Sequence, residues 1–140
     1  MDILQSKSNS FTVLSLNCQS LNAKFDQLKI YLFENYNEHS IKINMLCLQE
    51  TWLTADSDLS QFQIDGYNLI STGKSCSTHG GVAIYLHHKF NYNIIELTNS
   101  DLWDGQFLEV LIENEHNENK KVIVGNIYCP TGPLVENIYK

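Results

Sequence analysis

Two polar residues, Glu50 and Asn17, come at the ends of apolar runs in the sequence. Glu50 follows the run at residues 43–48 closely, and Asn17 follows the run at residues 11–16. A buried strand would deliver such a residue to the edge of a sheet, where α/β folds bind ligands. Mg²⁺ binds through one or two carboxylates, with water and phosphate oxygens at its other positions. We therefore expect Glu50 to bind a metal and Asn17 to add an amide oxygen or orient a metal-bound water.

Each of these two residues, taken singly, also fits a structural role. Asn17 would then cap the helix region that follows it, and Glu50 would be a solvated residue at a strand end. The elements around them decide whether the two side chains meet.

Residues 11–48 read as a strand, a helix and a second strand. The β-branched run at residues 11–16 predicts a strand that stops at the polar residues 17–20. Apolar residues at steps of three and four predict an amphipathic helix over residues 22–38; they are Phe25, Leu28, Leu32 and Tyr36. The apolar run at 43–48 predicts a buried strand. Such a crossover makes the two strands parallel, which would place Asn17 and Glu50 together at their carboxyl ends.

Shorter strands are predicted in the second half of the chain. They cover residues 67–71, 82–86 after the Gly80-Gly81 pair, and 92–96. Residues 107–113 and 120–128 predict a hairpin around the polar loop 114–119, and the prolines at 130 and 133 close its second strand. The fold class is therefore α/β, with a mixed, largely antiparallel sheet and covering helices. One edge of that sheet is expected to carry Asn17, Glu50 and Tyr128.

Composition and charge exclude several classes of protein. A length of 140 residues, 43% of them hydrophobic and 18% charged, is typical of one globular domain and excludes disorder. Nine positive residues, all lysine, stand against 16 acidic residues and give a net charge of −7. Proteins that coat nucleic acid bind through clusters of Lys and Arg. Any contact with nucleic acid is therefore expected to be local.

Cysteine spacing and the N-terminus indicate the compartment. Four cysteines at positions 18, 47, 76 and 129 form no C-x-x-C pair, which argues against zinc. Three of them lie in apolar runs and are expected to be buried, reduced thiols. The first ten residues lack the apolar core of a signal peptide, and no run approaches the ~20 residues of a membrane span. We expect an intracellular protein that is neither secreted nor membrane-bound.

Four short motifs follow one another at characteristic spacings. They are Leu-Ser-Leu-Asn-Cys-Gln-Ser-Leu at 14–21, Cys-Leu-Gln-Glu-Thr-Trp-Leu at 47–53, Gly-Gly-Val-Ala-Ile-Tyr at 80–85 and Asn-Ile-Tyr-Cys-Pro at 126–130. In this order they resemble the endonuclease/exonuclease/phosphatase superfamily. More narrowly, they resemble the apurinic-type endonuclease domain of non-LTR retrotransposons, which precedes the reverse transcriptase. The resemblance covers about residues 11 to 133.

The resemblance implies roles for individual positions. Asn17 matches an Asn that helps to place the metal and the scissile phosphate. Glu50 matches the Glu that binds Mg²⁺ or Mn²⁺, and Tyr128 matches a Tyr whose hydroxyl lies near the phosphate. Some members carry an acidic residue where this chain has Gln19, which supplies no charge. The strand from Gly80 to Tyr85 is implied to be architectural.

The chain departs from the family in its second half. The Asp-x-Asn pair that positions the attacking water and the late Ser-Asp-His are absent from the sequence. None of the histidines, at positions 39, 79, 87, 88 and 116, is placed to substitute. His87 and His88 are expected to end a surface strand and His116 to lie in a polar turn. For His79, beside the glycines, contact with substrate is the less favoured of two interpretations, and a structural role is expected. We therefore expect a flexible N-terminus over 1–10 and a truncated domain over 11–140, the N-terminal half of a four-layered α/β sandwich.

Three functions remain open on these grounds. The first is a fragment of a Mg²⁺-dependent DNA endonuclease that nicks target DNA for reverse transcription. It would be inactive as given, with DNA and the reverse transcriptase domain as partners and a nuclear location implied by the resemblance. The second is a phosphatase of the same superfamily acting on a small phosphoester, which would suit the acidic charge. The third is a non-catalytic remnant that at most binds a partner.

Overall fold

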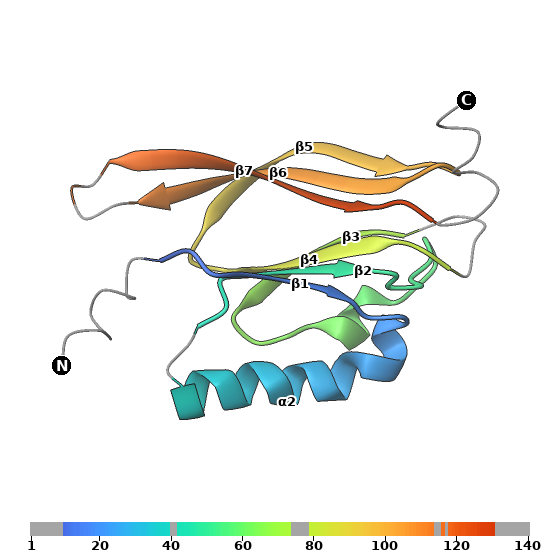
Figure 1. The fold of residues 1–140 in the computed structure, drawn as a ribbon, viewed down its shortest axis with the longest axis horizontal. Helices are drawn as coiled ribbons and strands as arrows, with labels where there is room; N and C mark the ends of the chain where they lie inside the picture. Colours follow the sequence, from blue (N-terminus) through green and yellow to red (C-terminus); the bar gives the residue numbers. More distant parts are fainter. Residues whose placement is uncertain (1–9, 40–41, 74–78, 114–115, 117, 131–140) are drawn as a thin grey trace.

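A helix and two sheets are stacked in three layers (Figure 1). The computed structural model describes residues 10–39, 42–73, 79–113, 116 and 118–130. The helix α2 (Leu21–His39) covers one face of a four-stranded sheet, and a three-stranded sheet covers the other face. This confirms the α/β class. Cys76 and Pro133, one of the two prolines predicted to close the last strand, lie outside the described residues, as does the predicted flexible N-terminus apart from Ser10.

The four-stranded sheet is mixed. Its strands are β1 (Val13–Asn17), β2 (Met45–Gln49), β4 (Val82–His87) and β3 (Tyr67–Thr72), in that spatial order. β1 runs parallel to β2, with Asn17 paired to Gln49, while β4 is antiparallel to both β2 and β3. The parallel pair confirms the prediction from the strand–helix–strand pattern.

The second sheet is antiparallel and consists of β5 (Asn91–Asn99), β6 (Asp104–Glu113) and β7 (Asn119–Tyr128). β6 and β7 form the predicted hairpin. The expectation that Asn17, Glu50 and Tyr128 share one sheet is wrong, because Tyr128 ends β7 in this second sheet. Local alternation predicts that a segment is a strand, but packing between distant segments decides which sheet it joins.

Strands β2 and β4 are buried on both faces, as expected for strands between two layers. Leu46 and Leu48 of β2 pack in the cluster beneath α2, whereas Met45 and Cys47 pack between the sheets against Leu108 and other residues of β6. Every residue of β4 is buried. A short 3₁₀ helix, η1 (Leu59–Phe62), was not predicted from the sequence. Its Phe62 packs edge to face against Phe25 in the apolar cluster between α2 and the four-stranded sheet.

Helix α2 begins one residue earlier than predicted and is capped by Ser20, whose hydroxyl accepts a hydrogen bond from Ala23 N at 3.2 Å. The side chains of Leu21, Phe25, Leu28 and Leu32 are buried against the sheet. Tyr36, predicted to continue this face, is 58% exposed. No helix in the described part of the chain is long and apolar enough to cross a membrane.

Two predictions about single side chains need correction. His87 is buried rather than at the surface, and burial lowers its pKa to about 4, with the neighbouring charges of Lys42, His88 and Lys89 adding to the effect. Cys18 and Cys47 are buried free thiols as predicted, and burial raises the pKa of each to about 11. Cys129 is also free but exposed, because it follows the end of β7.

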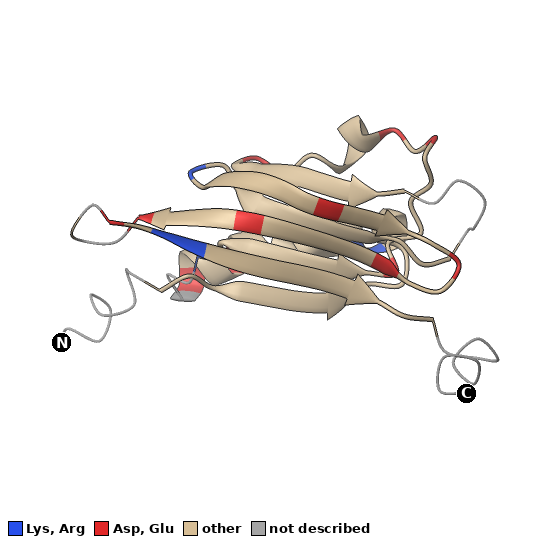
Figure 2. Cartoon of the chain, turned by 90° about the horizontal axis from the view of Figure 1, so that it is seen from above, with Lys and Arg blue, Asp and Glu red and all other residues tan. Residues whose placement is uncertain are grey.

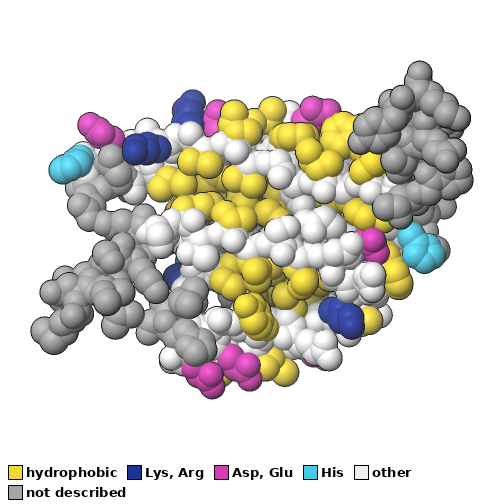
Figure 3. Space-filling model, in the orientation of Figure 1, with side chains coloured by type: hydrophobic (Ala, Val, Ile, Leu, Met, Phe, Trp, Pro, Cys, Tyr) yellow, Lys and Arg dark blue, Asp and Glu magenta, His cyan; other side chains and the backbone are white. Residues whose placement is uncertain are grey.

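Within the described residues, β1 and β7 each lie at one edge of their sheet, and these two edges lie on the same side of the molecule (Figure 1). Exposed apolar side chains include Val13 and Leu16 on β1 and Ile123 and Ile127 on β7. Figure 3 shows apolar side chains on this side in two bands, one over the three-stranded sheet and one between β1 and α2. Both edges therefore present unpaired strand backbone beside apolar surface.

Candidate active site

The loops that follow β1 and β2 lie side by side at the carboxyl ends of these strands. Three backbone hydrogen bonds of 2.9 Å join them. Cys18 N donates to Gln49 O, Ser20 N to Glu50 O, and Leu21 N to Thr51 O. The ladder of the parallel strands thus continues into the loops, so residues 17–21 and 49–51 hold each other in place.

A third loop, at Gly80 and Gly81, supports Glu50 from the other side. Thr51 N donates to Gly81 O at 3.2 Å and Trp52 N to Gly80 O at 2.9 Å. Gly81 has a φ of +80°, and a Cβ at this position would lie 2.8 Å from Thr51 Oγ1. Only glycine allows both this backbone conformation and this close approach. The architectural role predicted for the glycine pair therefore has a direct geometric basis.

Backbone strain is concentrated in the same loops. Among the described residues, the non-glycine positions with positive φ are Gln19, Ser20, Glu50 and Trp52, at 45°, 86°, 54° and 59°. Each such conformation costs of order 1–3 kcal/mol and persists only where the surroundings hold it, often at functional sites. The hydrogen bonds described above provide that support for Ser20, Glu50 and Trp52.

Asn17 and Glu50 are in direct contact. Asn17 Nδ2 donates a hydrogen bond to Glu50 Oε1 at 2.9 Å, and Glu50 is half-buried. The shared sheet edge predicted from the sequence therefore brings the two side chains together. The Asn17 side chain thus binds Glu50, and the residue that caps α2 is Ser20. Gln19, at the position where some family members are acidic, is exposed beside them.

Tyr128 reaches the same place from the other sheet. Tyr128 lines the same depression as Asn17 and Gln49, and it lies close enough to Glu50 for that carboxylate to affect the pKa of its hydroxyl. Burial raises the pKa of Tyr128, and the hydrogen bond and charge of Glu50 and the charge of Asp104 raise it further. Tyr128 is therefore a protonated donor throughout the neutral pH range.

Asp104 is a residue that sequence reasoning missed. It is fully buried, pairs with Tyr128 in the β6–β7 register, and its Oδ2 accepts a hydrogen bond from Gly81 N at 3.0 Å. It thus ties the Gly80-Gly81 loop to the second sheet beneath Tyr128. Asp104 precedes the strand predicted at 107–113, and an isolated acidic residue before a glycine gives no signal of burial.

The network around Asn126 joins the two sheets. Asn126 Oδ1 accepts a hydrogen bond from Gln49 Nε2 at 2.7 Å, and its Nδ2 lies 3.1 Å from the carbonyl oxygens of both Leu48 and Ala83. Its Nδ2 also lies 3.3 Å from Gln106 Oε1. Asn126 is 2% exposed, so these contacts replace all of its water. The sequence motif included Asn126, but nothing in the motif indicated this role.

The donor set at the site fits a hydrated hard cation. Glu50 provides a half-buried carboxylate and Asn17 an adjacent amide, while Asp104 is enclosed and holds Gly81. No group of three or more His, Cys, Asp or Glu suited to a metal occurs in the part of the chain that the structure describes. One carboxylate with water and phosphate oxygens is a usual environment for Mg²⁺, whereas a closed site for zinc requires about four protein ligands.

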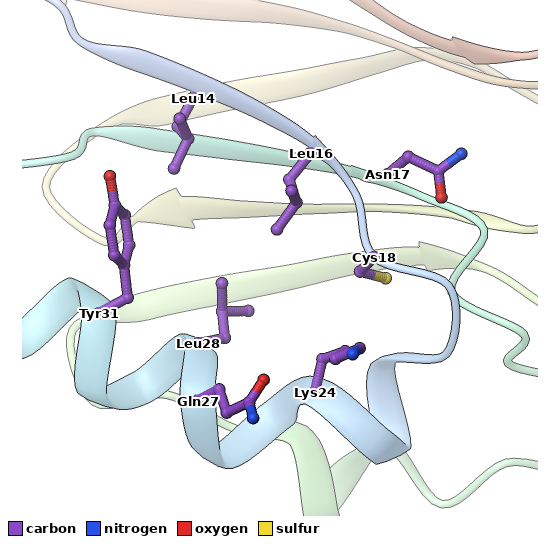
Figure 4. Close-up of a pocket in the computed structure, with 8 residues that line it drawn as sticks. All are labelled: Leu14, Leu16, Asn17, Cys18, Lys24, Gln27, Leu28 and Tyr31. Carbon is purple, nitrogen blue, oxygen red and sulfur yellow. The ribbon is translucent and has the colours of Figure 1, made fainter.

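Two open depressions meet near Asn17. One, of about 520 Å³, lies between the edges β1 and β7 and is lined by Asn17, Gln49 and Tyr128 among others. The second, of about 440 Å³, lies between β1 and α2, where Leu14 and Leu16 of β1 point toward the side of α2 that carries Tyr31 (Figure 4). Lys24 is the only charged side chain among the described residues that line it.

Basic residues form no continuous stripe on the three-stranded sheet (Figure 2).

Solved structures share this fold. The chain is similar to the APE2 catalytic domain of Xenopus laevis, with 20% identity and a TM-score of 0.62, covering 91% of this chain and 49% of that one. It is also similar to the 3′ phosphatase NExo from Neisseria bound to a product DNA hairpin, with 20% identity and a TM-score of 0.58, covering 91% and 47%. A 3′–5′ exonuclease (NExo) from Neisseria meningitidis matches at 21% identity and a TM-score of 0.55, covering 89% and 46%.

These likenesses show the fold. The chain spans about half the length of each of these solved structures. The chain shares the mixed α/β architecture of about half of each of these structures. No family model matches the sequence, and no curated protein matches it.

Proposed function

We propose that this chain is part of a divalent-metal-dependent nuclease that hydrolyses a phosphodiester in DNA. The observation that carries the proposal is the meeting of Asn17, Glu50 and Tyr128. These residues lie at the ends of three strands in two sheets, yet Asn17 donates a hydrogen bond to the Glu50 carboxylate and Tyr128 lies near enough for that carboxylate to raise its pKa. A carboxylate held by a neutral donor and by strained loops, with a tyrosine from the second sheet beside it, is a preorganised site rather than a solvated strand end.

Each of the three residues has a proposed role. Glu50 would hold a hydrated Mg²⁺ or Mn²⁺, and Asn17 would fix the orientation of that carboxylate and contact the phosphate. A bound divalent ion supplies positive charge that stabilises the negative charge developing on a phosphate. Tyr128 would donate its hydroxyl proton to a phosphate oxygen, since its raised pKa keeps that proton in place.

These residues account for only part of the chemistry. Hydrolysis also needs an oriented water with a general base, and the Asp-x-Asn and Ser-Asp-His motifs that supply such groups in the resembling family are absent from these 140 residues. We propose that a further segment of a longer domain supplies them. The span of about half the length of the solved structures supports this. Residues 1–140 alone are then an inactive fragment.

The finer proposal is a target-DNA endonuclease of non-LTR retrotransposon type. Such an enzyme would leave a 3′-hydroxyl from which its reverse transcriptase domain extends, and it would work in the nucleus. The order and spacing of the four motifs support this branch. A phosphatase for a small phosphoester is the second candidate, favoured by the net charge of −7 and the absence of arginine. Duplex DNA is normally bound through many cationic contacts with phosphates.

A nicking assay tests the proposal. Supercoiled plasmid and Mg²⁺ are incubated with the longest protein encoded by the reading frame that contains these residues, beside its Glu50→Ala and Tyr128→Phe variants. We expect nicking that Glu50→Ala abolishes. Residues 1–140 alone should nick at least about 10²- to 10⁴-fold more slowly, the usual cost of losing a general base.

Three results would contradict parts of the proposal. Rapid nicking by residues 1–140 that depends on Glu50 would mean that the fragment holds a complete site. Release of phosphate from small esters without nicking would favour the phosphatase. A long reading frame that neither nicks nor releases phosphate would favour a binding module.

A further inference from the structure

An exposed aromatic pair stands beside the candidate site. Trp52 is 37% exposed and contacts the ring of His79 edge to face, with ring centroids 4.9 Å apart. Thr51 and Leu53, its neighbours in the chain, are both buried. Trp52 therefore projects outward from a segment that is otherwise fixed in the core.

The backbone of Trp52 is in a strained conformation. Trp52 has a φ of +59°, in the left-handed region that bulky residues avoid. The hydrogen bond from Trp52 N to Gly80 O, at 2.9 Å, fixes that conformation, and Gly80 is next to His79 in the chain. A surface tryptophan with no function would more readily adopt an ordinary conformation. The strain thus supports a role for the side chain itself.

Trp52 follows Glu50 by two positions in the chain. Only Thr51 separates Glu50 from Trp52, so their Cα atoms are at most about 7.6 Å apart, twice the spacing of consecutive Cα atoms. A phosphate at Glu50 would therefore bring an adjoining base within reach of the indole.

The charge of the chain favours recognition through bases. With no arginine and a net charge of −7, the protein can gain little affinity from neutralising phosphates. Stacking of a nucleobase on an aromatic side chain contributes about 1–3 kcal/mol per base and does not depend on charge. The two rings lie at 69° to each other, so His79 contacts at most one face of the indole, and Trp52 is 37% exposed. We expect a planar base to stack on the other face.

We propose that Trp52, oriented by His79, is a stacking platform for an unpaired nucleobase next to the phosphate at Glu50. The base is unpaired because bases inside a duplex are already stacked and present only their edges. The ligand is thus a single-stranded or flipped-out nucleotide. This inference rests on the proposed function, since it takes a nucleic acid as the substrate at Glu50.

Fluorescence quenching tests the platform in the full chain. A Trp103→Phe background leaves Trp52 as the only tryptophan, because the chain has two. Single-stranded oligothymidylate should quench this fluorescence, and Trp52→Ala should weaken binding of the labelled oligonucleotide by about 5- to 150-fold. Trp52→Phe should retain most of the affinity, and His79→Ala should lose less than Trp52→Ala. Circular dichroism checks that each variant is folded.

An abasic oligomer with the same phosphates is the matched control. Its binding should not change on Trp52→Ala, since it has no base to stack. Equal losses for both oligomers would overturn the platform and indicate a structural role for Trp52, as would absence of quenching. Binding to a blunt duplex with equal dependence on Trp52 would overturn the claim that the base is unpaired.

Glu50→Gln separates this inference from the proposed function. The variant should still bind oligothymidylate, because stacking does not need the carboxylate, while losing divalent metal at the site. Trp52-dependent binding without any metal at Glu50 would leave the platform standing and count against the proposed nuclease. Metal binding at Glu50 without Trp52-dependent binding of the oligonucleotide would overturn the platform and leave the proposed nuclease standing.

Discussion

Gln49 Nε2 donates a hydrogen bond to Asn126 Oδ1 at 2.7 Å, and this contact joins the two sheets beside the site. Gln49 directly precedes Glu50, and Asn126 lies two residues before Tyr128 on the same face of β7. The amide pair therefore sets the separation of the strand ends from which Glu50 and Tyr128 project. The contact between those two side chains depends on the sheets being held at this distance.

Asn126→Ala should destabilise the fold by about 2–4 kcal/mol, because it leaves buried carbonyls and the Gln49 amide without their partner. Urea unfolding measures the loss. Asn93→Ala is the matched control, since Asn93 is an exposed strand asparagine with one long contact of 3.4 Å to Glu109. That variant should stay within about 0.5 kcal/mol of the wild type. Equal stability of the two variants would show that the Asn126 network does not join the sheets.

Gly81→Ala should be costlier than Gly66→Ala. Both glycines have positive φ, at 80° and 88°, so an alanine is strained at either position. A Cβ at Gly66 meets nothing closer than 3.7 Å, whereas at Gly81 it lies 2.8 Å from Thr51 Oγ1. Overpacking should add about 1–3 kcal/mol at Gly81, measured by denaturant unfolding. Similar losses for the two variants would mean that the Thr51 contact yields easily.

Burial of His87 predicts a pH dependence of stability. Its pKa is about 4 in the folded protein and about 6.5 in the unfolded chain. The unfolded state therefore binds more protons between these values, so the contribution is fully present above pH 6.5 and is lost as the pH falls towards 4. The loss should be of order 1–3 kcal/mol, since one pKa unit is ~1.4 kcal/mol.

The comparison of wild type with His87→Gln isolates this effect from titrating carboxylates. The difference in their free energies of unfolding should shrink steadily from pH 6.5 to pH 4. His88→Gln removes the exposed neighbour, whose charge contributes less to the shift than burial does, and should keep most of the wild-type slope. An unchanged slope in His87→Gln would contradict the assignment.

Glu50→Gln should lower the pKa of Tyr128. The substitution removes the negative charge and the charged hydrogen-bond acceptor that raise this pKa, while the effect of burial remains. NMR titration of the tyrosine rings, with Tyr128→Phe to assign the signal, measures the change. Glu109→Gln is the control, because Glu109 pairs with Lys121 elsewhere on the sheet. A Tyr128 pKa that responds equally to both substitutions would show that Glu50 is not its partner.

The sequence was informative where a local pattern has one structural meaning. Buried positions in α2 recur at helical spacing, and a crossover between neighbouring strands has a strong preference for the parallel arrangement of β1 and β2. These two features were enough to predict that Asn17 and Glu50 would meet. Tyr36 was misplaced because its polarity is compatible with either face of the helix.

Long-range features of the site could not be predicted in this way. The pairing of β5, β6 and β7 as a separate sheet depends on packing between distant segments. Positive φ at Glu50 and Trp52 leaves no trace in composition, since neither is glycine. The burial of Asp104 and the inter-sheet contacts of Asn126 likewise follow from tertiary structure rather than from neighbouring residues.

Mapping bound Mn²⁺ by NMR line broadening tests the central claim, that Glu50 with Asn17 and Tyr128 forms a metal and phosphate site. We expect amide signals of residues 17–20, 50–52 and 128 to broaden first as Mn²⁺ is added to the full chain. Binding should be weak, because a single carboxylate leaves the ion largely hydrated. Glu50→Gln should abolish this pattern, whereas Glu34→Gln on α2 should not. Broadening centred elsewhere, or a pattern that survives Glu50→Gln, would contradict the account.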